Sequence, residues 1–349
     1  MTHSWTTRRL QDFVVLQRGF DLPTQARRPG PYPVLSSGQT QGTHDVGPVG
    51  GPGFVIGRAT NLGQPTWCDS DYWPLNTVLY AKDFLGNDPR FAYYWFLGHD
   101  LSGFNSGSVQ PMLNRNYIAD VPVEVPPLDE QTAIAATLGA LDDKIDSNRR
   151  AVGLAFDLAQ AEFSRAVSYS SKKVELRTIA EHKPGKYLAK HYYEDGPYVV
   201  YGSNSIMGTH REALYEGPLM VMARIGSNCG ALHWSNTPAW VNNNASAIIA
   251  TNGFDPWILR WVLESIDMSK YRAGTGQPFI EVSALMDSEV VVPSEVAAKR
   301  IAERLRVLAG LESHLSTESR QLEIVRDTLL PELIGGRLMV GSKPSGAVG

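Results

Sequence analysis

Residues 134–159 read IAATLGALDDKIDSNRRAVGLAFDLA, with apolar or small residues at alternating steps of four and three positions. Such steps keep one narrow face of an α-helix apolar, with the 3.5-residue period of a coiled coil. Proline is absent from Gln131 to about Val167, so we predict a helix of roughly 35 residues and about 50 Å. The seam positions are Ile134, Leu138, Leu141, Ile145, Asn148, Val152, Ala155 and Ala159.

Asn148 is the polar position of this seam. A lone asparagine in a coiled-coil seam often fixes the register of the paired helices. The alternative is that the helix leaves the seam at this residue.

A second heptad pattern begins after Pro293 and continues to about Leu330. Its nine seam positions include six apolar residues, and the polar ones are Glu312, Ser319 and Arg326. Two long heptad helices in one chain can bury their seams against each other, and we expect an antiparallel pair. The residues predicted to make this pairing are Ile134, Leu138, Leu141, Ile145, Asn148, Val152, Ile301, Leu305, Leu308, Leu315 and Leu322.

The sequence also contains an internal repeat, because residues near its start recur about 166 positions later in the same order. Arg58 matches Arg224 and, after one added residue, Trp73 matches Trp240. A constant offset over many pairs indicates a duplicated unit, which folds as two similar halves. The block Gly107-Ser108-Val109-Gln110-Pro111 likewise matches Gly274-Thr275-Gly276-Gln277-Pro278.

Each half is rich in glycine, proline and aromatic residues and has short apolar runs, which are typical of strands and turns. One helix is expected near residues 90–97 and its counterpart near residues 256–263. We therefore predict an α+β fold with an internal pseudo-two-fold repeat, in which two similar strand-rich α/β domains are separated by two long antiparallel helices. The predicted segments are domain 1–127, helix 128–168, domain 172–293, helix 294–337 and a flexible tail, 338–349.

Composition limits the possible functions. The net charge is −4, and residues 1–127 carry 9 basic and 10 acidic side chains, while residues 172–293 carry 11 and 12. A chain so balanced can bind DNA only through local basic spots and hydrogen bonds, or with a partner that supplies phosphate contacts. The sequence has no apolar run of membrane-spanning length. Its two cysteines, Cys68 and Cys229, are expected to be structural thiols in a reducing cytoplasm.

The motifs of common catalytic sites are missing from the sequence, including the phosphate-binding loop, the zinc-protease helix and the nucleophile elbow. A duplicated enzyme would repeat its acid, base or nucleophile, whereas the residues that recur here are Arg, Gly, Ser or Thr, Gln, Trp and Pro. We therefore expect no catalytic residue, no metal ligand and no cofactor bound by this chain.

Side chains of the recurring types suit the recognition of hydrogen-bonding edges. Glutamine can contact adenine with two hydrogen bonds, and Ser, Thr and Arg contact bases or phosphates. The competing interpretations are that Gln110 and Gln277 bond their own loops and that Arg58 and Arg224 bridge carbonyl groups. The candidate DNA-binding residues are Ser36, Ser37, Gln39, Arg58, Ser108, Gln110, Arg115, Tyr201, Ser203, Asn204, Arg224, Asn228, Asn242, Asn243, Arg272, Thr275 and Gln277.

The passage that joins the first domain to its helix resembles the specificity subunits of type I restriction–modification systems. The resemblance is carried by the repeated Gly-Ser/Thr-x-Gln-Pro block, by residues 125–131 (VPPLDEQ) and by the heptads that follow. Residues 329–338 (LLPELIGGRL) resemble the C-terminal helix end of that family. The second copy departs from the pattern, because residues 293–298 (PSEVAA) lack the Pro-Pro and Glu-Gln of the first.

The resemblance implies two target recognition domains, each reading half of a split, asymmetric site in double-stranded DNA. It implies that the helices fix the spacer between the half-sites and dock two modification subunits, which bind S-adenosylmethionine and methylate adenine. A restriction subunit that uses ATP and magnesium would complete a cytoplasmic complex. Two rival functions are a non-reading scaffold of a DNA modification or phage-defence complex and a duplicated hydrolase with an unfamiliar site.

Overall fold

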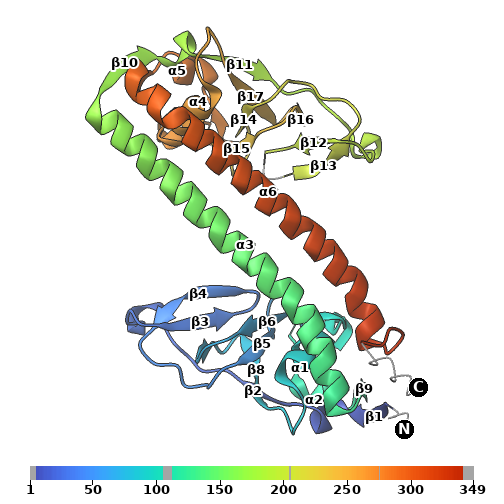
Figure 1. Ribbon diagram of the computed structural model, residues 1–349. Helices are drawn as coiled ribbons and strands as arrows, with labels where there is room; N and C mark the ends of the chain where they lie inside the picture. Colours follow the sequence, from blue (N-terminus) through green and yellow to red (C-terminus); the bar gives the residue numbers. More distant parts are fainter. Residues whose placement is uncertain (1–4, 105–111, 204–205, 275, 341–349) are drawn as a thin grey trace, which may run out of the picture. The chain divides into compact units, whose positions relative to one another are not determined.

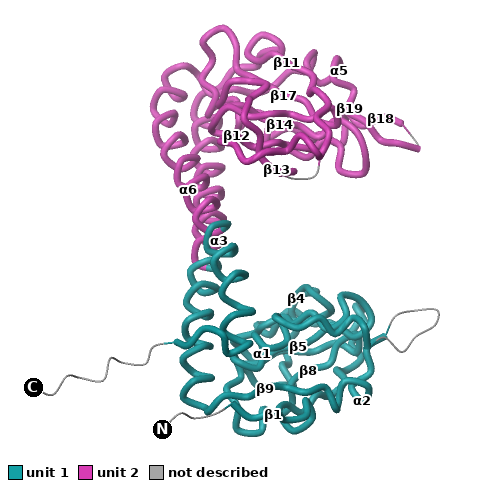
Figure 2. Tube along the Cα trace, turned by 90° about the vertical axis from the view of Figure 1, so that its right-hand side faces the viewer, with its two compact units in different colours: residues 1–146, 320–349 teal, residues 147–319 magenta. Residues whose placement is uncertain are grey.

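The computed structural model of the chain describes residues 5–104, 112–203, 206–274 and 276–340 (Figure 1). The chain divides into two compact units, coloured in Figure 2, which comprise residues 1–146 with 320–349 and residues 147–319. Each unit holds one strand-rich domain and one portion of each of two long helices, α3 (Leu128–Tyr169) and α6 (Glu295–Ile334). The compact units thus divide both helices, whereas the boundaries predicted from sequence keep each helix whole.

The elements of the first domain are β1 (Thr6–Arg9), β2 (Val15–Arg18), β3 (Tyr32–Ser36), β4 (Gln39–His44), β5 (Gly53–Gly57), β6 (Pro65–Cys68), β7 (Trp73–Pro74), β8 (Val78–Asp83), α1 (Pro89–Leu97), α2 (Arg115–Ile118) and β9 (Pro122–Val125). They form a four-stranded sheet in the order β2-β8-β5-β6, a three-stranded sheet in the order β4-β3-β7, and the pair β1-β9. The β3 and β7 strands run parallel, and the other neighbours are antiparallel.

The elements of the second domain are β10 (Ser171–Glu175), β11 (Ala180–Pro184), β12 (Tyr198–Tyr201), β13 (Ile206–His210), β14 (Leu219–Ala223), β15 (Leu232–Ser235), β16 (Ala239–Val241), β17 (Ala245–Ala250), α4 (Pro256–Glu264), β18 (Arg272–Ala273), β19 (Phe279–Ile280), α5 (Val282–Met286) and β20 (Glu289–Pro293). Their sheets repeat those of the first domain in the orders β11-β17-β14-β15, β13-β12-β16 and β10-β20, with β18-β19 in addition. Even the strand registers agree, since Tyr80 lies opposite Val55 and Ala247 lies opposite Val221. The predicted fold class is confirmed.

Short 3-10 turns complete both domains, at Leu10–Asp12, Thr24–Ala26, Ser102–Phe104, Leu176–Thr178, Lys190–Tyr192 and Met268–Tyr271. The two predicted short helices are α1 and α4, and both begin in the same way. Asp88 caps α1 by accepting hydrogen bonds from the backbone N–H groups of residues 90 and 91, and Asp255 caps α4 from residues 257 and 258. A proline follows each cap, at a position that needs no N–H donor.

Each domain shares its hydrophobic core with the long helices. In the first unit, Trp95 of α1 is buried in one cluster with Leu138 of α3 and Leu333 of α6. In the second unit, Trp261 of α4 is buried with Phe163 of α3 and Leu305 of α6. Folding of each domain and pairing of the helices therefore bury the same apolar surface.

The helices α3 and α6 pack against each other as an antiparallel pair. In the second unit, Asn148 Nδ2 donates to Glu318 Oε2 at 2.8 Å, and Arg304 Nη1 lies 3.2 Å from Glu162 Oε1. In the first unit, Arg326 Nη1 lies 2.8 Å from Asp142 Oδ1. Residue numbers fall along α6 as they rise along α3, which defines the antiparallel direction.

The predicted seam is the face that the helices bury. Asn148 is only 2% exposed, so it lies within the seam, as the register interpretation requires. The residues predicted to pair are all buried or half-buried: Ile134, Leu138, Leu141, Ile145, Asn148, Val152, Ile301, Leu305, Leu308, Leu315 and Leu322.

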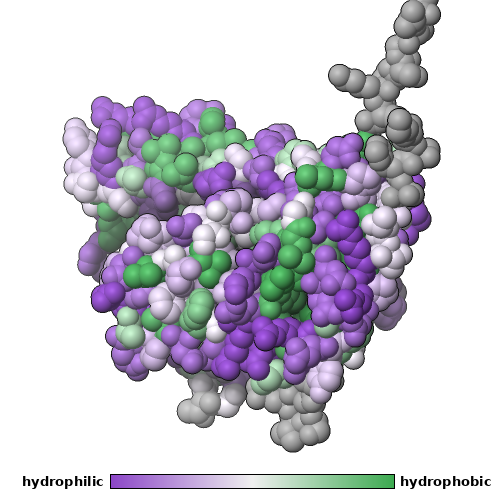
Figure 3. All heavy atoms as spheres, turned by 90° about the horizontal axis from the view of Figure 1, so that it is seen from below, coloured by the Kyte–Doolittle hydropathy of each residue, from purple (hydrophilic) through white to green (hydrophobic). Residues whose placement is uncertain are grey.

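The surface is mixed in character. Figure 3 shows polar side chains spread between the apolar ones over the face that it presents, which is ordinary for a folded protein. Among the described residues, no helix combines the length and apolar character needed to cross a membrane.

The hydrogen bonds of Gln131 explain why a glutamine lies in the first turn of α3. Its Nε2 donates to Asn87 Oδ1 at 3.0 Å and to the Pro126 carbonyl at 2.9 Å, and its Oε1 accepts the Asp88 N–H at 2.9 Å. This buried side chain thereby ties the starts of α1 and α3 together. The equivalent residue in the second copy is Ala298, so the two helix starts differ, in line with the departure seen in the sequence.

Replacing Gln131 with leucine should keep the volume and leave three buried polar groups without this partner. We expect the change to destabilise the protein by about 3 kcal/mol, which corresponds to a fall in Tm on the order of 10 °C. Thermal unfolding followed by circular dichroism measures it. The exposed neighbour provides the control, Thr132→Ala, which should shift Tm by less than about 2 °C; an equally small shift for Gln131→Leu would contradict the prediction.

Candidate nucleic-acid interface

Arg58 and Arg224 occupy the same place in the two domains, immediately after β5 and β14. The backbone N–H of Arg58 donates to the Thr77 carbonyl, and that of Arg224 donates to the Asn244 carbonyl. Their own carbonyls accept the N–H groups of Leu113 and Ile280 respectively, which are also equivalent positions. The duplicated framework therefore presents one arginine at the same sheet end in each domain.

The two guanidinium groups make equivalent contacts. Arg58 Nη1 donates to the Asn76 carbonyl at 3.4 Å, and Arg224 Nη2 donates to the Asn243 carbonyl at 3.3 Å. Each arginine thus makes one contact of the kind expected if its role is to bridge carbonyl groups. A guanidinium has five N–H donors, and both side chains are only half-buried, so donors remain for an external acceptor.

Basic side chains gather around Arg58. Arg115 Nη1 donates to the Leu16 carbonyl at 3.3 Å, and Arg18 lies at the end of the same strand, opposite Leu79. Burial and then repulsion from Arg18 lower the pKa of Arg58. Among the described residues, no acidic side chain forms an ion pair with any of these three arginines. Their unneutralised charge makes this end of the sheet attractive to an anion such as a DNA phosphate.

The equivalent end of the second sheet has different side chains. His182 stands where the first domain has Leu16, Pro184 stands where it has Arg18, and Ser246 stands where it has Leu79. Burial and then the charge of Arg224 lower the pKa of His182, so its ring is neutral near pH 7. The exposed Arg272 follows on β18. The two domains therefore share one framework and differ in the side chains beside the recurrent arginine.

Four of the candidate DNA-binding residues are buried in their own domain. Ser36 and Ser37 donate to the backbone carbonyls of Gln39 and Thr60, and Tyr201 donates to the Trp234 carbonyl. Asn242 bonds both the N–H and the carbonyl of Leu188. These side chains hold loops and sheets in place, and each of the four residues is at most 9% exposed.

The remaining candidates divide by exposure, and their contact with DNA stays a prediction. Half-buried positions are Arg58, Ser203 and Arg224. Exposed positions are Gln39, Arg115, Asn228, Asn243, Arg272 and Gln277. Four candidates lie outside the described residues: Ser108, Gln110, Asn204 and Thr275.

Sequence reasoning missed Arg18 and His182 as members of these two clusters. Neither belongs to a motif, and the repeat pairs them with Pro184 and Leu16, so no recurrence drew attention to them. The available signal was the alternation of β2 and β11, which places residues 16 and 18, or 182 and 184, on the same face of the strand.

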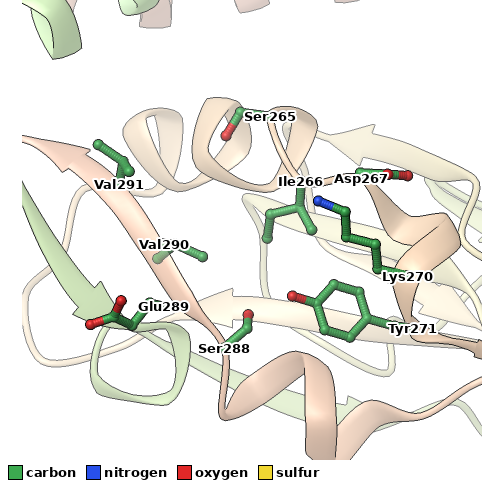
Figure 4. A pocket seen from close by; sticks show the side chains of 9 residues that line it. All are labelled: Ser265, Ile266, Asp267, Lys270, Tyr271, Ser288, Glu289, Val290 and Val291. Carbon is green, nitrogen blue, oxygen red and sulfur yellow. The ribbon is translucent and has the colours of Figure 1, made fainter.

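A pocket of about 220 Å³ lies between the end of α4 and β20 in the second domain (Figure 4). Its hydroxyl groups include those of Ser265 and Ser288, which donate to the backbone carbonyls of Val262 and Leu285. The ammonium group of Lys270 and the hydroxyl of Tyr271 also line it. Within the described ranges, no group of three or more His, Cys, Asp or Glu side chains is arranged to hold a metal ion.

Comparison with known proteins identifies the class to which this architecture belongs. Residues 3–152 match the family described as the type I restriction modification DNA specificity domain. The first part of the chain therefore matches a DNA specificity domain, which confirms the resemblance drawn from its sequence. No curated protein matches the chain.

One solved structure shows the same fold over both halves. The S subunit of a type I restriction–modification system from M. genitalium is 19% identical, with a TM-score of 0.68, over 95% of this chain and 96% of that chain. The HsdS subunit from Thermoanaerobacter tengcongensis is 14% identical, with a TM-score of 0.35, over 96% and 97% of the two chains. The first of these similarities covers both domains and both long helices, so the fold extends beyond the matched family region.

Adjacent asparagines test the distinction between buried and exposed candidates. Asn242→Ala should lower Tm by roughly 5 °C or more, because it removes hydrogen bonds from the buried Leu188 backbone. The exposed Asn243→Ala should shift Tm by less than about 2 °C. Differential scanning calorimetry of both variants measures the contrast, and equal Tm values would show that the burial of Asn242 has no structural role.

Proposed function

We propose that this chain is the DNA-recognition subunit of a type I restriction–modification complex and that it reads a bipartite, asymmetric site. The observation that carries the proposal is the duplicated framework, which presents Arg58 and Arg224 at equivalent sheet ends among side chains that differ. The first domain would read one half-site and the second domain the other. Exposed arginines and polar loops would contact phosphates and base edges.

The helix pair supports the second part of the proposal, in which α3 and α6 set the spacer and dock the modification subunits. Four large apolar side chains of the second unit are exposed on these helices: Leu154 at 70%, Leu158 at 52%, Val307 at 61% and Leu311 at 42%. Leu158 and Val307 line a shallow apolar groove with Glu162, Glu303 and Arg304 on its rim. An exposed apolar patch with a charged rim is typical of a protein–protein interface.

In the proposed complex the chemistry belongs to the partners. Two modification subunits would bind S-adenosylmethionine and methylate adenine, and a restriction subunit would use ATP and magnesium. This chain would contribute binding and positioning and no catalytic residue. The proposal is consistent with the near-neutral charge of both domains, because partners would supply part of the phosphate contact.

Methylome sequencing tests the function directly. A cell that expresses the cognate modification subunit with this chain should acquire a split adenine-methylation motif, and a cell with the modification subunit alone should not. A non-reading scaffold predicts modification without a motif that depends on this chain. That outcome would exclude sequence reading.

The two recurrent arginines test the assignment of half-sites. Arg58→Ala should relax methylation specificity in one half of the motif, and Arg224→Ala or Gln277→Ala in the other, with losses of roughly tenfold or more in modification rate. The matched controls are Arg9→Ala and Arg211→Ala, which remove exposed arginines already paired with Asp12 and Glu194. Relaxation of the same half-site by both Arg58 and Arg224 variants would contradict the one-domain, one-half-site arrangement.

Charge placed in the apolar groove tests partner docking. The double variant Leu158→Glu with Val307→Glu should lose co-purification with the modification subunit, because each new carboxylate would have to be desolvated on binding. Its Tm should stay within about 3 °C of the wild type, since both side chains are more than half exposed. Val296→Glu, also on an exposed position of α6, is the control. Full retention of the complex by the double variant would exclude this groove as the dock.

A further inference from the structure

The second domain places a buried cation against α6. The side chain of Arg260, on α4, is only 5% exposed, and that of Glu312, on α6, is 12% exposed. Arg260 Nη2 donates to Glu312 Oε2 at 2.6 Å. Glu312 is one of the three polar residues that interrupt the second heptad seam, so the apparent flaw in the seam has a specific partner.

Three aromatic rings surround the Arg260 guanidinium group. Its central carbon lies 5.1 Å from the Trp261 ring, 5.6 Å from the Trp234 ring and 5.8 Å from the Phe156 ring. These rings come from α4, β15 and α3. The cation therefore stands where the sheet and the short helix of the domain meet both long helices, and the ring faces favour its charge.

The Arg260–Glu312 pair has few hydrogen bonds for so buried a site. Arg260 Nε and Nη1 and Glu312 Oε1 are buried and have no hydrogen-bonding partner among the described residues. Desolvation of two charges with one close contact is unfavourable compared with an apolar pair of similar volume. A contribution to overall stability is therefore a weak explanation for this pair, and a contribution to specificity is a better one.

The first domain contacts its helix by different chemistry. The residues equivalent to Arg260 and Glu312 are Tyr93 and Ile145, which cannot form an ion pair. Instead Tyr94 donates to Asp142 at 2.6 Å, and Arg90 Nη2 lies 2.5 Å from Asp143 Oδ1, so the carboxylates of α3 hold α1.

The positions equivalent to Arg90 and Gly139 reverse the arrangement in the second domain. They are Trp257 on α4 and Arg306 on α6, and the Arg306 guanidinium carbon lies 4.7 Å from the Trp257 ring. In the first unit the domain supplies the cation of this contact, whereas in the second unit the long helix supplies it. The two docking sites are therefore related by duplication but chemically distinct.

An exchange of docking sites would be unfavourable in both directions. Arg90 of the first domain would meet Arg306 of α6, and Arg260 of the second domain would be buried against Ile145 and would lose the close contact with Glu312. Contacts between like charges and buried charges without a close partner raise the free energy of a wrong arrangement. A duplicated chain needs such a determinant, because each domain could otherwise pack on the wrong long helix.

We propose that Arg260 and Glu312 are positioning residues that assign the second domain to α6 and fix its orientation on that helix. The pair acts by making this docking site distinct from its duplicate in the first half. Only the DNA measurement below rests on the proposed function, because the docking itself is a property of the folded chain.

Thermal unfolding of the full chain is the first test. Arg260→Met and Glu312→Leu alone each leave one buried charge without its hydrogen-bonded partner and should lower Tm on the order of 10 °C. The double variant Arg260→Met with Glu312→Leu removes both charges and should recover to within about 3 °C of the wild type or exceed it. Lys299→Ala with Glu295→Ala, an exposed ion pair of the same helix, is the control. Single variants that cost no more than this control would overturn the proposal.

Spacer selectivity separates positioning from packing. In the assembled complex, the wild type should methylate only DNA with the native spacer between half-sites. For each protein, the rate on sites with a spacer one base pair longer or shorter is divided by the rate on the native site. This ratio should be at least about tenfold higher in the folded double variant than in the wild type. Unchanged selectivity in a stable double variant would overturn the positioning role. A wild type that methylates no split motif at any spacing would instead refute the proposed function and leave the thermal result intact.

Discussion

The burial of one apolar seam is the constraint on which the structure depends. Leu138 and Phe163 on α3 are buried in the cores of the two domains, and each core also includes apolar side chains of α6. The helices cannot separate without exposing those cores to water, which makes pairing and domain folding parts of one hydrophobic association. Isolated helices of this length would gain little from intrinsic propensity alone, so tertiary packing is what stabilises them.

The polar positions of the seam give that association its direction and register. Asn148 bonds Glu318, Glu312 pairs with Arg260, and Arg326 pairs with Asp142. Apolar contacts tolerate sliding by a heptad, whereas a buried polar group that loses its partner is unfavourable. The interruptions that make the second heptad pattern look imperfect are thus the positions that select one alignment.

Duplication sets the common framework, and a few substitutions make the two halves distinct. Both domains have the same sheet orders, capped helices and recurrent arginine, while Arg18 is replaced by Pro184 and Leu16 by His182. Strand register depends on many residues and tolerates few changes. Single side chains beside the recurrent arginine can change without altering the strand pairing, so they can diverge and, in the proposed function, recognise different half-sites.

The heptad spacing and the constant offset determined the two long helices and the repeated strand-rich domains from sequence alone, because both patterns are periodic properties of the chain. Sequence could not distinguish Asn242 from Asn243, since only the folded domain brings one of them to Leu188 and leaves the other exposed. It likewise could not show that Gln131 joins Asn87 or that Arg260 meets Glu312. Those pairings join residues 44 and 52 positions apart, and burial and partner choice over such separations are decided by tertiary packing and not by any local pattern.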